Sequence, residues 1–170
     1  TTDGRYILYD LNALYFDFGQ MAPGDVEDVA LLQRIEDQSG QWLLFDRNPG
    51  SPNIRFIMTS GGQQLRLLYL NIKGRLTEIE LTHNRKRSTL VKYGYDNDGH
   101  LISVTDAAGN VTRRFAYADG LMVSHINALG FECRYRWETI ADQPRVVQMG
   151  TSEGENAFFT YDRQARQTQM

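Results

Sequence analysis

Apolar and polar residues alternate along several short stretches of the chain. Residues 131–137 read Phe-Glu-Cys-Arg-Tyr-Arg-Trp, so every odd position is apolar and every even position is charged. Because successive side chains of a β-strand point to opposite faces, this pattern predicts a strand with one apolar face. The same period of two recurs over residues 54–58 and 111–117. The chain is therefore predicted to be built from β-strands.

Glycine, together with Asp, Asn or Ser, separates these alternating stretches. Glycine adopts positive φ at little cost, and Asn or Asp side chains bond to their own backbone, which is the chemistry of tight turns. We expect hairpin turns at three such places: Gln38-Ser39-Gly40, Asn97-Asp98-Gly99 and Ala108-Gly109-Asn110. Strand and turn then alternate, and stacked hairpins form a continuous antiparallel sheet.

The turn residues recur at a fixed interval. Gly99 and Gly120, Asp106 and Asn127, and Gly109 and Gly130 are each 21 residues apart. A fixed interval of this size is typical of repeat proteins, in which each unit packs on the next. Weaker copies flank this region at 69–79 and at 161–166, where Ala165 occupies the glycine position.

The segment from Asp25 to Asp37 admits two interpretations. Its apolar residues fit a short helix, but we favour a loop followed by a strand over residues 31–36, with residues 42–45 as its hairpin partner. We expect all four prolines to lie in loops, where a missing N–H harms no strand pairing. These are Pro23, Pro49, Pro52 and Pro144. No linker is evident, so we predict N-terminal strands and a loop over 1–33 and one repeat region over 34–170.

Composition excludes several classes of protein. The 170 residues are 41% hydrophobic and 23% charged, which is too apolar for a disordered tail. A net charge of −3 argues against a nucleic-acid partner, and we assign the basic cluster Arg85-Lys86-Arg87 to a solvated turn. No apolar run reaches 18 residues, so no membrane-spanning helix is expected. Without an initiator Met or a signal peptide, the chain is expected to be a piece of a longer protein.

No cluster of residues identifies a catalytic, cofactor-binding or metal site, and we assign none. Asp96-Asn97-Asp98-Gly99 begins like a calcium loop, but the position of its final Glu holds Ala107, so a turn is preferred. The single Cys133 lies on an apolar strand face and is expected to be a buried, inert thiol. Other residues weighed and assigned to sheet surface or turns are His83, His100, His125, Glu36-Asp37, Glu78, Glu80 and Gly61-Gly62.

The repeat itself resembles a known family. Tyr95-Asp96-Asn97-Asp98-Gly99-His100-Leu101, continuing to Asp106 and Gly109, is similar to the repeat of the Rhs/YD-repeat proteins. The similarity extends from about Arg34 to Tyr161. It implies an all-β fold, an antiparallel sheet of tandem hairpins that forms a segment of a curved, spiralling β-shell. Insecticidal toxin complex C components and teneurins share this architecture.

The resemblance also implies a function. In bacterial members the shell encloses a C-terminal toxin domain of a secreted effector, and the resemblance implies a type VI secretion effector that is made in the cytoplasm and then exported or delivered to a target cell. The implied partners are the remaining parent chain, its toxin domain, and a secretion spike or chaperone. In the family, a motif containing Asp-Pro closes the shell and supports self-cleavage. This chain has no Asp-Pro, so we assign none of its residues to a protease site and expect no enzyme activity.

The alternative function is a surface adhesion or carbohydrate-binding module. As an isolated fragment, the chain is expected to self-associate through its sheet edges.

Overall fold

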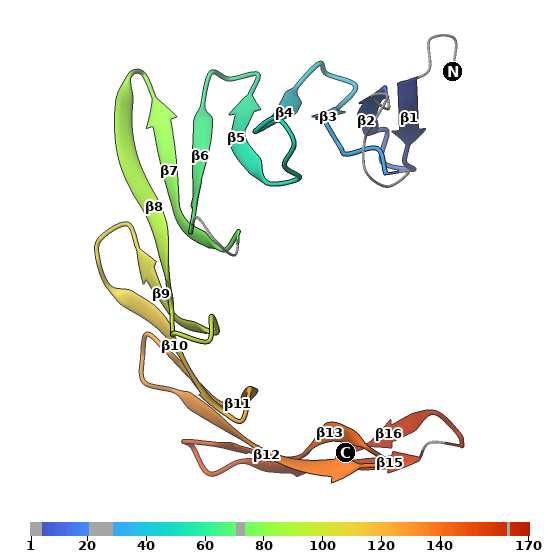
Figure 1. The fold of residues 1–170 in the computed structure, drawn as a ribbon, viewed down its shortest axis with the longest axis vertical. Helices are drawn as coiled ribbons and strands as arrows, with labels where there is room; N and C mark the ends of the chain where they lie inside the picture. The colour runs from blue at the N-terminus through green and yellow to red at the C-terminus, as the bar shows by residue number, and fades with distance from the viewer. Residues whose placement is uncertain (1–4, 21–28, 71–73, 163) are drawn as a thin grey trace. The chain divides into compact units, whose positions relative to one another are not determined.

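The computed structural model is an antiparallel β-structure in which strands follow one another in chain order (Figure 1). It describes residues 5–20, 29–70, 74–162 and 164–170. These residues contain no helix, and therefore none long and apolar enough to cross a membrane. Strands β1 to β14 form one sheet in which each strand pairs with its neighbours in sequence, and β15 and β16 form a separate hairpin. The predicted all-β fold is confirmed.

The longest strands, of seven to ten residues, are β7, β8 and β10 to β13, and the strands at both ends of the chain are shorter. The first eight are β1 Arg5–Tyr9, β2 Tyr15–Gln20, β3 Arg34–Glu36, β4 Trp42–Arg47, β5 Ile54–Thr59, β6 Gln64–Tyr69, β7 Leu76–His83 and β8 Lys86–Tyr95. The others are β9 Leu101–Asp106, β10 Val111–Ala118, β11 Leu121–Asn127, β12 Glu132–Ile140, β13 Gln143–Thr151, β14 Asn156–Phe158, β15 Thr160–Asp162 and β16 Gln167–Gln169.

Contacts between Cα atoms divide the chain into two compact units, Thr1–Leu90 and Val91–Met170, with the boundary inside β8. In the first unit one face of the sheet is apolar. Ile57 pairs with Phe45 and Leu65, and Leu65 pairs in turn with Leu81. The other face carries ion pairs, such as Arg34–Glu36 at 2.8 Å and Arg66–Glu80 at 3.4 Å.

In the second unit the predicted alternation is confirmed. Cys133 is buried, and Phe131, Tyr135 and Trp137 are half-buried, whereas the charged residues Arg134, Arg136 and Glu138 are exposed and Glu132 is half-buried. Cys133 lies opposite His125, which lies opposite Phe115, so one face carries a row of apolar and aromatic side chains across three strands.

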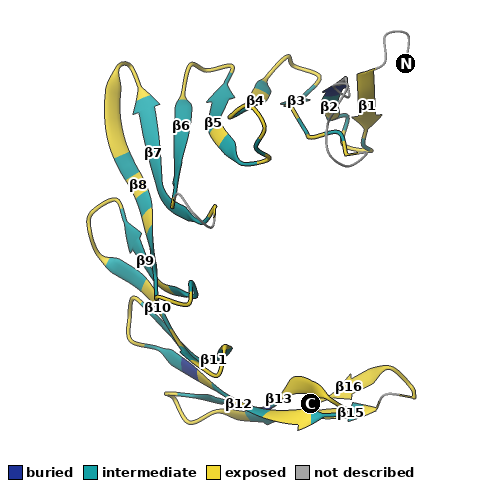
Figure 2. Ribbon diagram, viewed as in Figure 1, coloured by how far each residue is buried: buried dark blue, intermediate teal, exposed yellow. Residues whose placement is uncertain are grey.

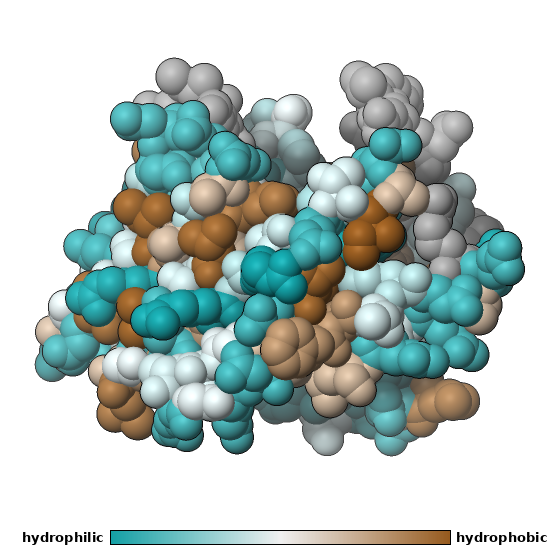
Figure 3. Space-filling model, turned by 90° about the horizontal axis from the view of Figure 1, so that it is seen from below, coloured by the Kyte–Doolittle hydropathy of each residue, from teal (hydrophilic) through white to brown (hydrophobic). Residues whose placement is uncertain are grey.

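Very little of the described chain is buried, because no second layer covers the sheet within either unit (Figure 2). Cys133 and Val147 are the only buried apolar residues described, each 8% exposed. The chain exposes 12337 Å², whereas a compact protein of 19.5 kDa exposes about 8,500 Å². Apolar side chains also reach the surface in separate patches between hydrophilic ones in Figure 3.

Several predictions in the less regular regions need correction. The strand predicted over 31–36 begins only at Arg34, and the described residues before it, 29–33, form neither strand nor helix. Residues 25–28 of the alternative helix, and Pro23, lie outside the described residues. Pro144, predicted in a loop, lies in β13 opposite Thr139. It is the second residue of the strand, close to the turn, where proline is best tolerated. In the last turn the positive φ belongs to Arg166, one residue after Ala165.

Candidate functional site

The most regular feature of the structure is a five-residue turn that joins neighbouring strands. At Asp106, between β9 and β10, one carboxylate oxygen accepts hydrogen bonds from the backbone N–H of Ala108 and of Asn110, both at 2.9 Å. The Gly109 N–H donates to the Asp106 carbonyl at 3.1 Å, and the Asp106 N–H donates to the Asn110 carbonyl at 2.9 Å. Gly109 has a φ of +87°, which glycine adopts without a Cβ clash. A short side-chain acceptor at the first position and a residue with positive φ at the fourth therefore define this turn.

The same turn recurs at both ends of the described chain. Its first residue is Asp10, Asp37, Thr59, Asp96, Asp106, Asn127 or Thr151, and in each case the side-chain oxygen accepts the N–H of the fifth residue. The fourth residue is glycine with φ between 75° and 90°, except at Ala13, where φ is 60°. The predicted turns at 38–40, 97–99 and 108–110 are confirmed. Asp, Asn and Thr are interchangeable because each supplies one short side-chain acceptor.

These bonds favour the ionised carboxylate. The backbone N–H of Asn110 holds the pKa of Asp106 below its usual value, although partial burial opposes it. The N–H of Leu14 lowers the pKa of Asp10 in the same way. Hydrogen bonds donated to the charged form of an acid stabilise that form. The turns that begin at Asp10 and Asp106 are therefore stabilised at neutral pH, where both of these carboxylates are ionised.

A second recurring device links strands through a polar side chain and a backbone carbonyl 15 residues earlier. The Tyr69 hydroxyl donates to the Ile54 carbonyl at 2.8 Å, and the Tyr161 hydroxyl donates to the Val146 carbonyl at 2.6 Å. Trp137 Nε1 donates to the Met122 carbonyl at 2.7 Å. Each of these carbonyls lies beside a shift in strand register. A β-bulge leaves backbone groups without ladder partners, and these donors satisfy them.

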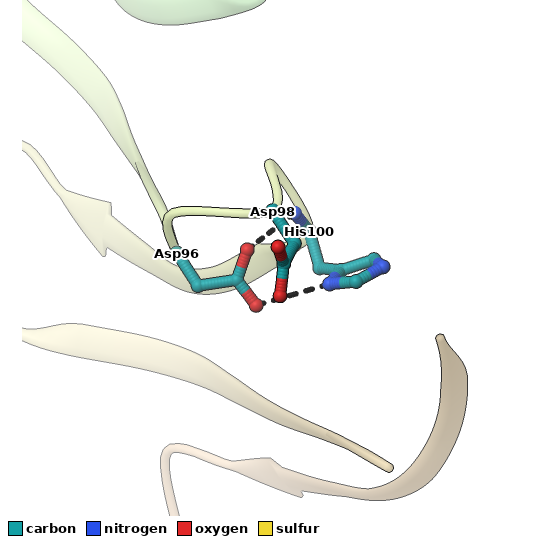
Figure 4. A group of neighbouring side chains, drawn as sticks. All are labelled: Asp96, Asp98 and His100. Atoms are coloured by element: carbon teal, nitrogen blue, oxygen red, sulfur yellow. Dashed lines mark hydrogen bonds and ion pairs between the residues drawn. The ribbon is translucent and has the colours of Figure 1, made fainter. Parts of the chain in front are cut away.

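One cluster of titratable groups lies at the turn between β8 and β9 (Figure 4). Potential ligand atoms of Asp96, Asp98 and His100 all lie within 4.8 Å of one another. His100 donates its backbone N–H to one Asp96 oxygen at 2.8 Å, and its Nδ1 lies 3.0 Å from the other. The His100 ring also stacks on Tyr117, with centroids 4.6 Å apart. Both oxygens of Asp96 are therefore already engaged in the turn, which explains the cluster without a metal ion.

Burial of Asp96 would raise its pKa, but the bonds from His100 and Gly99 outweigh burial and lower the pKa. The sequence did not predict the contact between Asp96 and His100. Their spacing of four residues within a glycine turn is the signal that could have indicated it.

The remaining candidate residues are dispersed, and their contacts are those of a sheet. His125 contacts the Tyr135 hydroxyl at 3.0 Å, His83 is exposed, and Cys133 is a free, buried thiol. Glu80 lies between Arg66 and Arg87. The paired acids considered in the sequence have separate partners: Glu36 pairs with Arg34, Asp37 holds a turn, and Glu78 accepts from Thr89 at 2.6 Å. Gly61-Gly62 lies in the turn that begins at Thr59.

Comparisons with known proteins agree with this architecture. The RHS Repeat family model matches residues 71–111 and 95–132. The chain is 49% identical over all 170 residues to double-stranded DNA deaminase toxin A of Burkholderia cenocepacia strain H111, of which it spans 12%. It is 38% identical over 76 residues, 45% of the chain, to toxin protein Tse5 of Pseudomonas aeruginosa strain PAO1, of which it spans 6%.

A solved structure has the same fold. A chain in the crystal structure of TcdB2-TccC3-Cdc42 aligns with 94% of this chain at a TM-score of 0.58, with 13% sequence identity, over 8% of its own length. Repeated turns, strands in strict chain order and the matched family model lead to one assignment: the chain belongs to the Rhs/YD-repeat family.

Proposed function

We propose that the chain is a structural segment of a longer Rhs toxin protein, in which it forms part of a wall that encloses a C-terminal toxin domain. The observation that carries this proposal is the single-layered sheet. Apolar residues such as Ile57 and Leu65 lie on an uncovered face, and only two apolar side chains are buried among the residues that the structure describes. An antiparallel sheet normally packs one face against a core. A wall that encloses a separate toxin domain would pack its apolar face against that domain.

The relatives support a role in a toxin. Both curated relatives are named as toxins, and the chain spans only 12% and 6% of them. An activity such as DNA deamination belongs to the relative as a whole, and we assign none to this segment. The regular turns and sheet-type contacts of the described residues fit a structural role, with any toxic activity elsewhere in the parent protein.

We further propose that the parent protein is made in the bacterial cytoplasm and delivered to competing cells by type VI secretion. Its partners would be the rest of the parent chain, the enclosed domain, and a secretion spike or chaperone. We also propose that residues 34–170 form one continuous wall segment that follows N-terminal strands over 1–33.

Limited proteolysis of the full-length protein that contains this chain tests enclosure. We expect the C-terminal domain to resist a protease that degrades the same domain when it is expressed alone, and to co-purify with the wall. Deletion of 107–117 removes a single strand, so every later strand reverses direction and presents its opposite face. This variant should lose the protection.

A matched deletion supplies the control. Removing 107–127 takes out one complete repeat of two strands and joins Asp106 to Ala128, which recreates the five-residue turn as Asp-Ala-Leu-Gly-Phe. Strand direction is retained, so we expect this variant to keep the protection. Free access of the protease to the toxin domain in the unaltered protein would refute enclosure. Binding to a glycan array by that protein would instead favour the adhesion or carbohydrate-binding alternative.

A further inference from the structure

The charges of the first unit are unevenly distributed along the chain. Residues 1–46 contain two basic and nine acidic residues, a net charge of −7, whereas residues 47–90 contain eight basic and two acidic residues, a net charge of +6. The two acids of the second stretch are Glu78 and Glu80. The net charge of −3 for the whole chain therefore does not represent this stretch, which contains β5, β6, β7 and the first half of β8.

The positive charge is most concentrated at the tip of the β7–β8 hairpin. Residues 83–88 are all exposed, and Arg85, Lys86 and Arg87 follow one another there (Figure 2). Because successive side chains of a strand point to opposite faces, Lys86 and Arg87 place charge on both faces of the hairpin. Arg85 lies in the turn itself, so the tip is basic from every direction of approach.

These charges are poorly neutralised by the rest of the unit. Arg87 Nε lies 3.8 Å from a Glu80 carboxylate oxygen, but the Arg87 side chain is still 57% exposed. Among the residues that the structure describes, none forms an ion pair or a side-chain hydrogen bond with Arg85 or Lys86. The turn over 59–63, which leads into the neighbouring strand β6, contains no acidic residue. Arg85 and Lys86 are therefore available to an anionic group outside this unit.

The conformation of the turn does not explain why Arg85 is there. Asn84 and Arg85 form a two-residue turn with φ of +50° and +62°. Gly, Asn and Asp are the residues that tolerate positive φ. The second residue of the other two-residue turns is Gly120, with φ of +76°, or Asp142, with φ of +64°. An arginine at this place is unfavourable for the backbone, which favours a role for its charge.

We propose that the tip of the β7–β8 hairpin, formed by Arg85, Lys86 and Arg87, is a docking site for an acidic segment of a separate protein. Guanidinium groups bind carboxylates through two parallel N–H···O bonds, and a two-residue turn holds them in a fixed place. The inference does not rest on the enclosure of a toxin domain.

Two features of the tip favour an acidic protein over other anionic partners. Residues 81–92 contain no Phe, Tyr or Trp on which the bases of a single-stranded nucleic acid could stack. Residues 82–89 contain no apolar side chain that could insert into a lipid bilayer. Recognition at this tip therefore depends on charge complementarity.

Binding of a fluorescent polyglutamate peptide to the full-length protein tests the proposal, measured by anisotropy at low ionic strength. Arg85→Gly combined with Lys86→Gln removes two charges from the tip. Glycine suits the positive φ at position 85, so this variant should keep its fold and its thermal midpoint. We expect its Kd to be at least about tenfold higher than that of the unaltered protein, and binding by the unaltered protein to weaken as salt is added. Lys86→Glu alone, which leaves the turn residues unchanged, is a second variant with the same direction of change.

Arg113→Gln combined with Arg114→Gln is the matched control, because these residues are also adjacent, exposed arginines. We expect its Kd to change by less than about twofold. Equal losses in the two double variants, or no binding of the peptide by the unaltered protein, would overturn the inference. Tighter binding to single-stranded DNA or to phosphatidylglycerol vesicles than to polyglutamate, if lost in the tip variant, would overturn the assignment of an acidic protein as the partner.

Discussion

The side chain of Asn127 offers a direct test of the five-residue turn. It accepts hydrogen bonds from the N–H groups of Leu129 at 2.9 Å and Phe131 at 3.0 Å. Asn127→Ala removes both bonds and leaves the Phe131 N–H in a partly buried place. A typical neutral hydrogen bond contributes about 0.5–1.5 kcal/mol, and water replaces part of the exposed one, so we expect a loss of about 1–2 kcal/mol. This corresponds to a roughly 5–30-fold larger population of the open turn.

Native-state hydrogen exchange measures this opening without requiring the whole chain to unfold in one step. The informative amide is that of Gly130, which donates to the Asn127 carbonyl at 3.1 Å. Its exchange rate should rise about 5–30-fold in Asn127→Ala when reclosing is faster than exchange.

Two replacements serve as controls, because the chain itself uses them at equivalent turns. Asn127→Asp matches Asp106 and Asn127→Thr matches Thr151, and each keeps one acceptor oxygen. Both should remain close to the unaltered protein at neutral pH. If Asn127→Asp were as damaging as Asn127→Ala, or if the alanine variant exchanged normally, the side-chain acceptor would not be what holds this turn.

Three further outcomes are expected. The folded pKa of Asp106 lies below its unfolded value, so the stabilisation that depends on its charge is complete above about pH 4 and is lost as the pH falls through the folded pKa. Asp106→Asn cannot ionise, so a denaturation series should show a flatter acid limb and, at pH 7, the loss of the part of the stability that depends on the charge. Tyr161→Phe removes the 2.6 Å bond to the Val146 carbonyl and should cost about 1 kcal/mol by urea titration. The 170-residue chain should scatter light as concentration-dependent oligomers because β1 is an exposed edge strand; Ile7→Lys should reduce this, and a stable monomer at high concentration would contradict it.

The local sequence pattern was sufficient to predict the strands and turns of the second unit. Alternation over 131–137 predicted one sheltered and one exposed face, and the structure has them. The face of the sheet on which a side chain lies follows from its position within the strand, so it can be predicted without knowledge of the rest of the fold. The turn at Asp106 was equally predictable, because its acceptor, its glycine and its hydrogen bonds all lie within five residues.

Prediction failed where pairing partners or backbone bonds depend on other strands. The strand expected over 31–36 begins only at Arg34, where pairing with Asp17 and Leu44 starts. Gln33, although outside the strand, still donates its N–H to the Asp17 carbonyl at 2.8 Å. Pro144 lies in a strand because the long partner β12 extends to the hairpin turn. Neither feature is visible in the hydrophobic pattern, since both are set by the length of the neighbouring strand.

The sequence by itself determined the class of fold, the order of strands and the turn that repeats, because a chain of tight hairpins pairs each strand with its neighbours in sequence. Only the tertiary structure decided where the register shifts and which side chain satisfies the carbonyl beside each shift, as Tyr161 does for Val146. It also decided that the sheet lacks a covering layer within each unit and that Leu11 and Leu129 extend into water. These properties depend on groups 15 or more residues apart, or on the whole surface, and a pattern with a period of two holds no information about either.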